Sequence, residues 1–125
     1  MLNTNLGKLS PDAVARRVIE LEAQSLLTFA ADLPEDFTAA INLILGTKGR
    51  LVISGMGKSG HIGHKIAATL ASTGTPSFFV HPAEASHGDL GMVTPEDICL
   101  MISNSGETSE LGDLIAHCLR FSIPI

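Results

Sequence analysis

Three short polar segments hold the side chains that could do chemistry in this sequence. They are "SGMGKSGHIGHK" at 54–65, "HPAEASHGDLGMV" at 81–93 and "SNSGETSE" at 103–110. Between them they carry lysine, histidine, hydroxyl and carboxylate groups, which are the groups that bind phosphate and move protons. The function therefore depends on whether the fold brings the three segments together.

The first segment has three glycines in the G-x-G-x-x-G spacing of a dinucleotide-binding turn, namely Gly55, Gly57 and Gly60. That fingerprint also needs an acidic residue at the end of the next strand to hold the ribose, and His81 stands there instead. "GKS" matches the end of a P-loop, but the first P-loop glycine would fall at Val52, inside a strand. A dinucleotide and a nucleoside triphosphate are thus disfavoured. Two interpretations stay open: the glycines only permit a tight turn, or the turn presents Lys58 to a ligand.

Hydroxyl side chains gather in the third segment, between an apolar run and a helical pattern. Ser103, Ser105 and Thr108 surround Gly106. A helix starting here would add free backbone N–H groups and a partial positive charge, and the set would bind one phosphate monoester. The alternative is ordinary capping, in which Ser105 caps the helix while Thr108 and Glu110 support its first turn.

The histidines of the other two segments are interpreted separately. His81 and His87 lie six positions apart and either contact a ligand or are simply solvated. A zinc site is possible there, although three closely placed ligands are not evident. His61 and His64 are interpreted as non-catalytic, and His117 is given no role.

The pattern of apolar residues predicts how these segments are positioned. One helix is predicted to begin at Ser10 and to end before Pro34. A second helix follows, with an inward face made of Phe37, Ala40, Ile41, Ile44 and Leu45. Strands are predicted at 51–55, 76–80 and 98–103, with a fourth beginning at 123–125, and helices at 58–74 and after the third segment. This order predicts an α/β fold, a doubly wound parallel sheet flanked by helices. Ligands bind such sheets at the carboxyl ends of the strands, where all three segments fall.

The composition of the chain limits the classes of partner that it could bind. Eight basic against thirteen acidic residues give a net charge of −5, and the five aromatics are all Phe, which argues against nucleic acid. No apolar run approaches the ~20 residues that span a membrane. Cys99 and Cys118 match no zinc or redox spacing, so Cys99 is expected in the core and the protein in the reducing cytoplasm.

Taken together, "SGMGKSGHIG", "ASTGTPSFFVHPAEASHGDLGMV" and "SNSGETSE" resemble the SIS (sugar isomerase) domain, and within it the arabinose-5-phosphate isomerase family. The resemblance implies a SIS-type, Rossmann-like domain at 47–125, truncated at its fourth strand. N-terminal helices at 1–46 would pack on the sheet or on a partner subunit. It also implies interconversion of D-ribulose 5-phosphate and D-arabinose 5-phosphate through an enediol, for Kdo and lipopolysaccharide synthesis, with no cofactor required. The family uses a later glutamate, a later histidine and CBS modules, so the chain is expected to be a fragment.

The resemblance also implies roles for particular residues. Lys58 and Glu110 match catalytic positions, and Lys58 or His87 could stabilise the enediolate. The expected substrate contacts are Ser59, Gly74, Thr75, His81, His87, Ser103, Asn104, Ser105, Gly106 and Thr108. His81 also falls where the family binds an inhibitory zinc. A sugar phosphate is the expected ligand and a homodimer or homotetramer the expected assembly; the alternative function is a non-catalytic SIS module that binds a sugar phosphate and regulates a partner.

Overall fold

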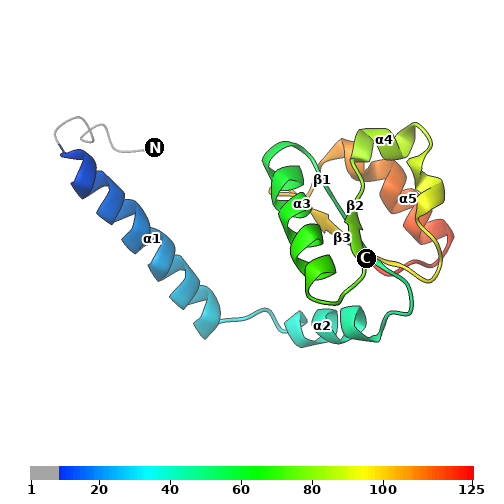
Figure 1. Cartoon of the computed structure of the whole chain (residues 1–125), viewed down its shortest axis with the longest axis horizontal. Coiled ribbons are helices and arrows are strands. Elements are labelled where there is room, and N and C mark those ends of the chain that lie inside the picture. Colours follow the sequence, from blue (N-terminus) through cyan, green and yellow to red (C-terminus); the bar gives the residue numbers. More distant parts are fainter. Residues whose placement is uncertain (1–8) are drawn as a thin grey trace. The chain divides into compact units, whose positions relative to one another are not determined.

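The computed structural model describes residues 9–125 and divides the chain into two compact units, Met1–Ala39 and Ala40–Ile125 (Figure 1). The first unit contains α1 (Pro11–Ala31). Its predicted start is confirmed, because the Ser10 side chain accepts a hydrogen bond from the Ala13 N–H at 3.3 Å and proline occupies the first helical position. No side chain of α1 is buried by its own unit. The helix therefore keeps an apolar face with no core of its own.

The second unit is built on a parallel sheet of three strands in the order β2-β1-β3. The strands are β1 (Leu51–Gly55), β2 (Ser77–Phe79) and β3 (Ile98–Ile102). Leu51 is in register with Ser77 on one side and with Ile98 on the other. The predicted parallel α/β sheet is thus confirmed, with the first strand at its centre.

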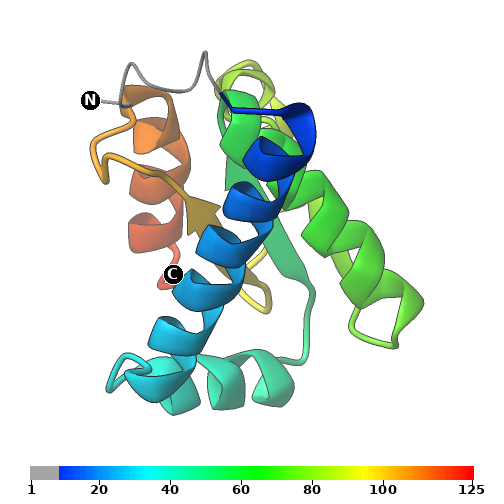
Figure 2. The ribbon, with the colours of Figure 1, turned by 90° about the vertical axis from the view of Figure 1, so that its left-hand side faces the viewer.

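Helices cover both faces of this sheet, and Figure 2 shows α3 (Gly57–Ser72) and α5 (Gly112–Arg120) on opposite sides of the strands. Alternate residues of β1 point to opposite faces. Leu51 and Ile53 pack in a cluster with Ala67 of α3, while Val52 packs in another with Leu114 of α5. Every residue of β1 is buried, as expected for the central strand of a sheet covered on both sides.

Several predicted boundaries differ from the structure. In α2 (Phe37–Gly46), Ile44 packs against the sheet core, but Ile41 and Leu45 are exposed, so α2 touches its unit along a narrow stripe. α3 ends at Ser72, before Gly74, and β2 is shorter than predicted. Residues 123–125 form no strand: the Cys99 N–H donates to the Pro124 carbonyl at 2.9 Å, but proline has no N–H with which to extend the pairing.

The described part of the chain contains no helix that is both long enough and apolar enough to cross a membrane.

Candidate functional site

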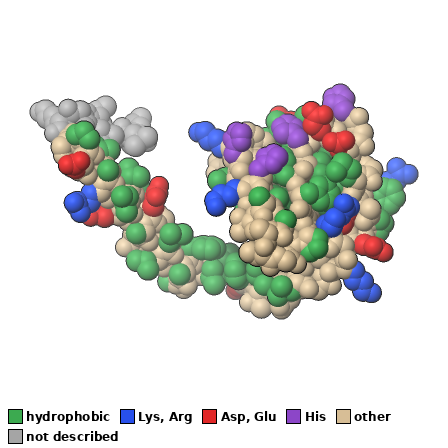
Figure 3. Space-filling view, in the orientation of Figure 1, with side chains coloured by type: hydrophobic (Ala, Val, Ile, Leu, Met, Phe, Trp, Pro, Cys, Tyr) green, Lys and Arg blue, Asp and Glu red, His purple; other side chains and the backbone are tan. Residues whose placement is uncertain are grey.

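The three polar segments predicted to carry chemistry all begin at the carboxyl edge of the sheet. β1 ends at Gly55, β2 at Phe79 and β3 at Ile102, and these strands are parallel neighbours. Lys58 is the second residue of α3, directly after the first of these ends. Figure 3 shows histidine side chains gathered at the end of the second unit where α4 lies in Figure 1. Parallel pairing therefore brings the Lys58 turn, the His81 segment and the Ser103 segment to one edge.

The glycines of the first segment shape the turn between β1 and α3. Gly57 has a φ of +54°, which favours glycine. A Cβ on Gly60 would lie 2.7 Å from the carbonyl oxygen of Gly55, so helix and strand touch backbone to backbone. This close packing is the task of the third glycine in a G-x-G-x-x-G turn. Packing and turn geometry thus explain the glycines of the motif. Lys58 and Ser59 remain as the residues whose side chains could contact a ligand.

His81 begins the second segment as the N-cap of α4 (Pro82–Ser86), and its Nδ1 accepts a hydrogen bond from the Ala83 N–H at 3.3 Å. A ring nitrogen that accepts carries no proton, so neutral His81 has its proton on Nε2. Nε2–H is thus the group that remains to donate to a ligand. His87 follows α4 as its C-cap and is exposed.

Two observations limit how a zinc ion could bind at His81. Within residues 9–125, no group of three or more His, Cys, Asp or Glu side chains is arranged to hold a metal ion. Because Nδ1 of His81 is engaged by the helix cap, a metal would have to take Nε2 and displace its proton. An inhibitory zinc at this residue stays a prediction.

In the third segment, hydroxyl groups close the loop on itself. The Ser103 and Thr108 hydroxyl oxygens lie 2.7 Å apart, and Ser103 Oγ also accepts from the Gly106 N–H at 3.0 Å. Ser105 Oγ accepts from the Glu107 N–H at 3.1 Å. These two backbone N–H groups are therefore occupied, which corrects the expectation that they would be free for a phosphate. The O–H of Ser105 and one O–H of the Ser103–Thr108 pair remain as donors.

Capping by Ser105 also differs from the expectation. Its hydrogen bond reaches the backbone two residues on and stabilises the loop; it caps no helix, because α5 begins only at Gly112. Asn104 and Ser105 are exposed, while Ser103 and Thr108 are half-buried. The loop thus presents its tip to solvent and keeps its hydroxyl pair at its base.

Glu110 lies in the short 3-10 turn η3 (Ser109–Leu111), directly ahead of α5. Its carboxylate is fully exposed. Hydrogen bonds from its own backbone N–H and from the Ser109 hydroxyl, at 3.0 Å, hold the pKa of Glu110 below its ordinary value. The group is therefore ionised at neutral pH, although general bases are often tuned toward a higher pKa.

Gly74 and Thr75 lie apart from the other predicted contacts. They precede β2, so they sit at the amino edge of the sheet, opposite Lys58 and His81. Gly74 has a φ of +100° in the turn after α3, and the Thr75 N–H donates to the Leu70 carbonyl at 2.9 Å. The structure gives them a clear part in ending the helix, while substrate contact stays a prediction.

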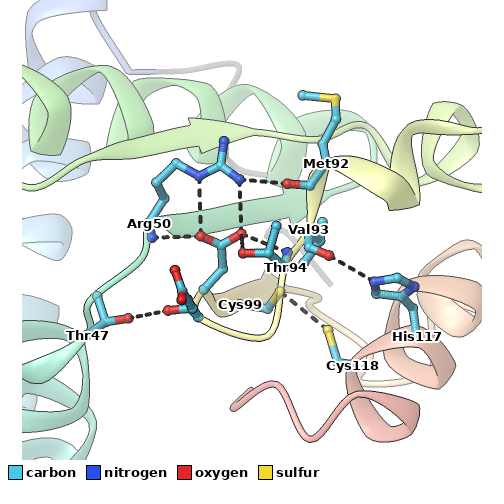
Figure 4. A network of polar contacts seen from close by, with 10 residues as sticks. Thr47, Arg50, Met92, Val93, Thr94, Cys99, His117 and Cys118 are labelled. Atoms are coloured by element: carbon cyan, nitrogen blue, oxygen red, sulfur yellow. Dashed lines mark hydrogen bonds and ion pairs between the residues drawn. The ribbon is translucent and has the colours of Figure 1, made fainter.

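Sequence reasoning did not find an ion pair at that amino edge. Asp97 is buried and accepts from the Arg50 backbone N–H at 2.7 Å and from the guanidinium Nε and Nη2 at 3.2 and 3.0 Å (Figure 4). Its Oδ2 also accepts from the Thr94 N–H and hydroxyl. Burial alone would raise the pKa of Asp97, but these hydrogen bonds outweigh it and lower the pKa below 3.8. The signal was available, because Arg50 and Asp97 each directly precede one of two neighbouring parallel strands.

This ion pair anchors the far end of the second segment. Arg50 Nη2 also donates to the Met92 carbonyl at 2.7 Å, and His117 Nε2 lies 3.0 Å from the Val93 carbonyl (Figure 4). Because that carbonyl can only accept, the ring nitrogen of His117 is the donor. The segment that begins with His81 is thus held at its end by Arg50, which directly precedes β1, and by His117 of α5.

A buried thiol pair joins β3 to α5. Cys118 Sγ donates to Cys99 Sγ at 3.3 Å, both side chains are buried, and burial raises the pKa of both thiols. Cys99 belongs to the core cluster with Val52 and Leu114. The expectation that Cys99 is a core residue is confirmed.

Comparisons with known proteins show the family of the chain. The profile of the SIS domain family matches residues 44–125. Arabinose 5-phosphate isomerase KdsD of Pseudomonas aeruginosa is 56% identical over 111 residues, covering 89% of this chain and 34% of that protein. Its counterpart in Yersinia pestis is 58% identical over 108 residues, covering 86% of this chain and 33% of that protein. The chain thus spans about a third of the length of the curated relatives it matches.

A solved structure is similar as well. An E. coli CFT073 protein in complex with arabinose 5-phosphate superposes with a TM-score of 0.81 at 37% sequence identity. The superposition covers 92% of this chain and 63% of that one.

Proposed function

Because the chain belongs to the SIS domain family, we propose that it is the sugar-phosphate-binding part of an aldose–ketose isomerase. The specific reaction we propose is the interconversion of D-ribulose 5-phosphate and D-arabinose 5-phosphate, which would supply the Kdo precursor of lipopolysaccharide. The names of the relatives support the choice of sugar. The observation that carries the proposal is the meeting of the Lys58 turn, the His81 segment and the hydroxyl loop at one edge of the sheet.

The hydroxyl loop is the proposed phosphate site. Ser105 and the Ser103–Thr108 pair offer O–H donors, and Gly106, at a φ of +73°, gives the loop its turn. Phosphate oxygens accept such bonds. Holding the phosphate positions the reacting carbons, so that binding energy remote from the chemistry lowers the barrier.

The proton transfer is proposed to use groups around that anchor. In the enediol mechanism a base removes the proton from the carbon beside the carbonyl, and the carbonyl oxygen becomes anionic. Glu110 is the proposed base, since its carboxylate is ionised and lies two residues beyond Thr108. Lys58 or His87 would stabilise the oxyanion, and the Nε2–H of His81 is a further donor. None of these steps calls for a cofactor.

We also propose a homodimer or homotetramer in the cytoplasm. The apolar face of α1 includes Ile19, Leu26 and Phe29, which its own unit does not bury, and a second copy would cover them. The free thiols suit a reducing compartment. Sedimentation at micromolar concentration is the test, and a monomer there would contradict the assembly.

The deciding experiment uses the full-length protein with Glu110→Gln and the matched variant Glu107→Gln, which removes the same charge from the same loop. We expect Glu110→Gln to bind arabinose 5-phosphate normally in calorimetry and to lose ~10²–10⁴-fold in kcat. Glu107→Gln should retain the parental rate. If Glu110→Gln isomerises as fast as the parent, the assignment of the base is wrong.

A second candidate is a non-catalytic SIS module that senses a sugar phosphate. The exposed position and lowered pKa of Glu110 favour it, because neither is typical of a tuned base. Parental protein that binds arabinose 5-phosphate without converting it would select this alternative.

A further inference from the structure

One aromatic ring lies between the lysine-bearing helix and the His81 segment. Phe79, the last residue of β2, packs on the glycines of α3. A Cβ on Gly63 would lie 2.9 Å from the ring Cε2 of Phe79, and one on Gly60 would lie 3.4 Å from its Cζ. The helix thus presents the backbone of two glycines to this ring. A side chain smaller than phenylalanine would not fill the space beside them.

The same ring contacts a histidine from each neighbouring segment. Its centroid lies 3.8 Å from that of His64 on α3, with an interplanar angle of 31°. It also lies 6.5 Å from that of His81, edge-on at 66°. The distance to His81 falls within the range of favourable aromatic pairs, about 4.5–7 Å, and the distance to His64 is shorter than that range. Phe79 therefore connects α3 to the start of α4.

The preceding residue provides a contrast. Phe78 points to the opposite face of the sheet, where the Arg50 guanidinium lies 4.6 Å from its ring centroid. Both phenylalanines are half-buried residues of the same short strand. Only Phe79 lies between the two segments of the candidate site.

His81 is thereby fixed at two points. The Ala83 N–H donates to Nδ1, and the Phe79 ring pairs edge-on with the imidazole. Lys58 is five residues before Gly63 on α3, the helix that packs against this ring. The space occupied by Phe79 therefore sets how far His81 stands from the Lys58 turn.

We propose that Phe79 is a positioning residue of the sugar-phosphate site, holding His81 against α3 with its Nε2–H available to the ligand. The inference rests on the proposed function, since it assigns His81 and Lys58 to one ligand. In this proposal, Phe79 acts on binding through His81.

That dependence gives a double-mutant test in the full-length protein. The variants are Phe79→Leu, His81→Asn, which keeps an N-cap acceptor, and their combination, with Phe78→Leu as control. We expect Phe79→Leu to raise the Kd and KM for arabinose 5-phosphate about two- to tenfold, the equivalent of one aromatic contact. In the His81→Asn background the same change should have no further effect. Phe78→Leu should leave Kd unchanged in either background.

Equal effects of Phe79→Leu in both backgrounds would overturn the proposal, as would an equal effect of Phe78→Leu. A measurement without ligand separates it from the proposed function. In NMR spectra, Phe79→Leu should shift the ring resonances of His64 and His81, but not those of His117. An unmoved His81 resonance refutes the positioning role, whereas failure of the parental protein to bind any sugar phosphate refutes the proposed function.

Discussion

Asp97→Asn tests whether the buried ion pair at the amino edge stabilises the second unit. The carboxylate accepts from Arg50 at three atoms and from Thr94 at two, and the substitution changes one oxygen to an NH₂ group of similar size. Whichever way the amide turns, at least two N–H donors then face another donor. The substitution should therefore destabilise the fold without creating a cavity.

The magnitude follows from the bonds lost. A hydrogen bond to a charged group contributes about 1.5–3 kcal/mol, and an unsatisfied buried donor costs about 1–3 kcal/mol. The Arg50 side chain is 42% exposed and can regain water, which favours the lower end of each range. One lost bond to the charged group and one unsatisfied backbone donor, each at the lower end, give a loss of about 3 kcal/mol, or about 10 °C in Tm for a chain of this length.

The assay is thermal unfolding followed by far-ultraviolet circular dichroism. Glu96→Gln is the control, because it removes the same charge at the neighbouring, exposed position. It should change Tm by no more than about 2 °C, as most surface substitutions do. An Asp97→Asn protein as stable as the Glu96→Gln protein would refute this account of the ion pair.

The lowered pKa of Asp97 also predicts how the stability of the protein depends on pH. The folded pKa of Asp97 is below its ordinary value of 3.8, so its stabilisation is fully present above that value and is lost as pH falls through the folded pKa. The parent and Asp97→Asn should therefore differ most at neutral pH and converge in strong acid. A difference that stayed constant down to low pH would contradict the role of the charge.

Three further outcomes are expected. Gly63→Ala should destabilise by about 1–3 kcal/mol in urea unfolding because its Cβ meets a ring, whereas Gly112→Ala, where a Cβ meets nothing within 4 Å, should be neutral or stabilising by up to about 1 kcal/mol. The buried thiol pair should resist iodoacetamide at neutral pH in mass spectrometry until urea unfolds the protein, since burial raises the pKa of both thiols; rapid labelling of the native protein would contradict this. Ser109→Ala removes one cause of the lowered pKa of Glu110, so the acid limb of the isomerase rate profile should move to higher pH if Glu110 is the base; an unmoved limb would argue against that role.

Much of the fold could be predicted because local patterns agree with it. Ser10 before proline marks a helix start, and the apolar run at 51–55 is typical of a fully buried strand. The third segment also emerged from its residue types alone. Residue types could not show which hydrogen bonds these groups already make: two backbone N–H groups that seemed available are held by Ser103 and Ser105.

Positions in three dimensions were also harder to predict. Gly74 and Thr75 lie at the amino end of β2, whereas His81 follows its carboxyl end, so their substrate contact stays a prediction. The inward face predicted for α2 assumed a neighbour along its whole length, whereas only Ile44 of its large side chains packs on the sheet core. Both depend on strand direction and helix placement, which residue patterns constrain weakly.

The short hydroxyl contact at the base of the third segment has a consequence for how that loop would meet an anion. Either Ser103 or Thr108 can supply the proton between them, and in both cases one hydroxyl hydrogen is left over. The loop thus allows two arrangements of the hydroxyl hydrogens while its heavy atoms stay fixed. Selecting one of two arrangements of equal energy would cost only about 0.4 kcal/mol. A change in the charge or tilt of the bound group could be met by rotating two hydrogens. The two residues are nevertheless unequal, because only Ser103 also closes the loop onto Gly106.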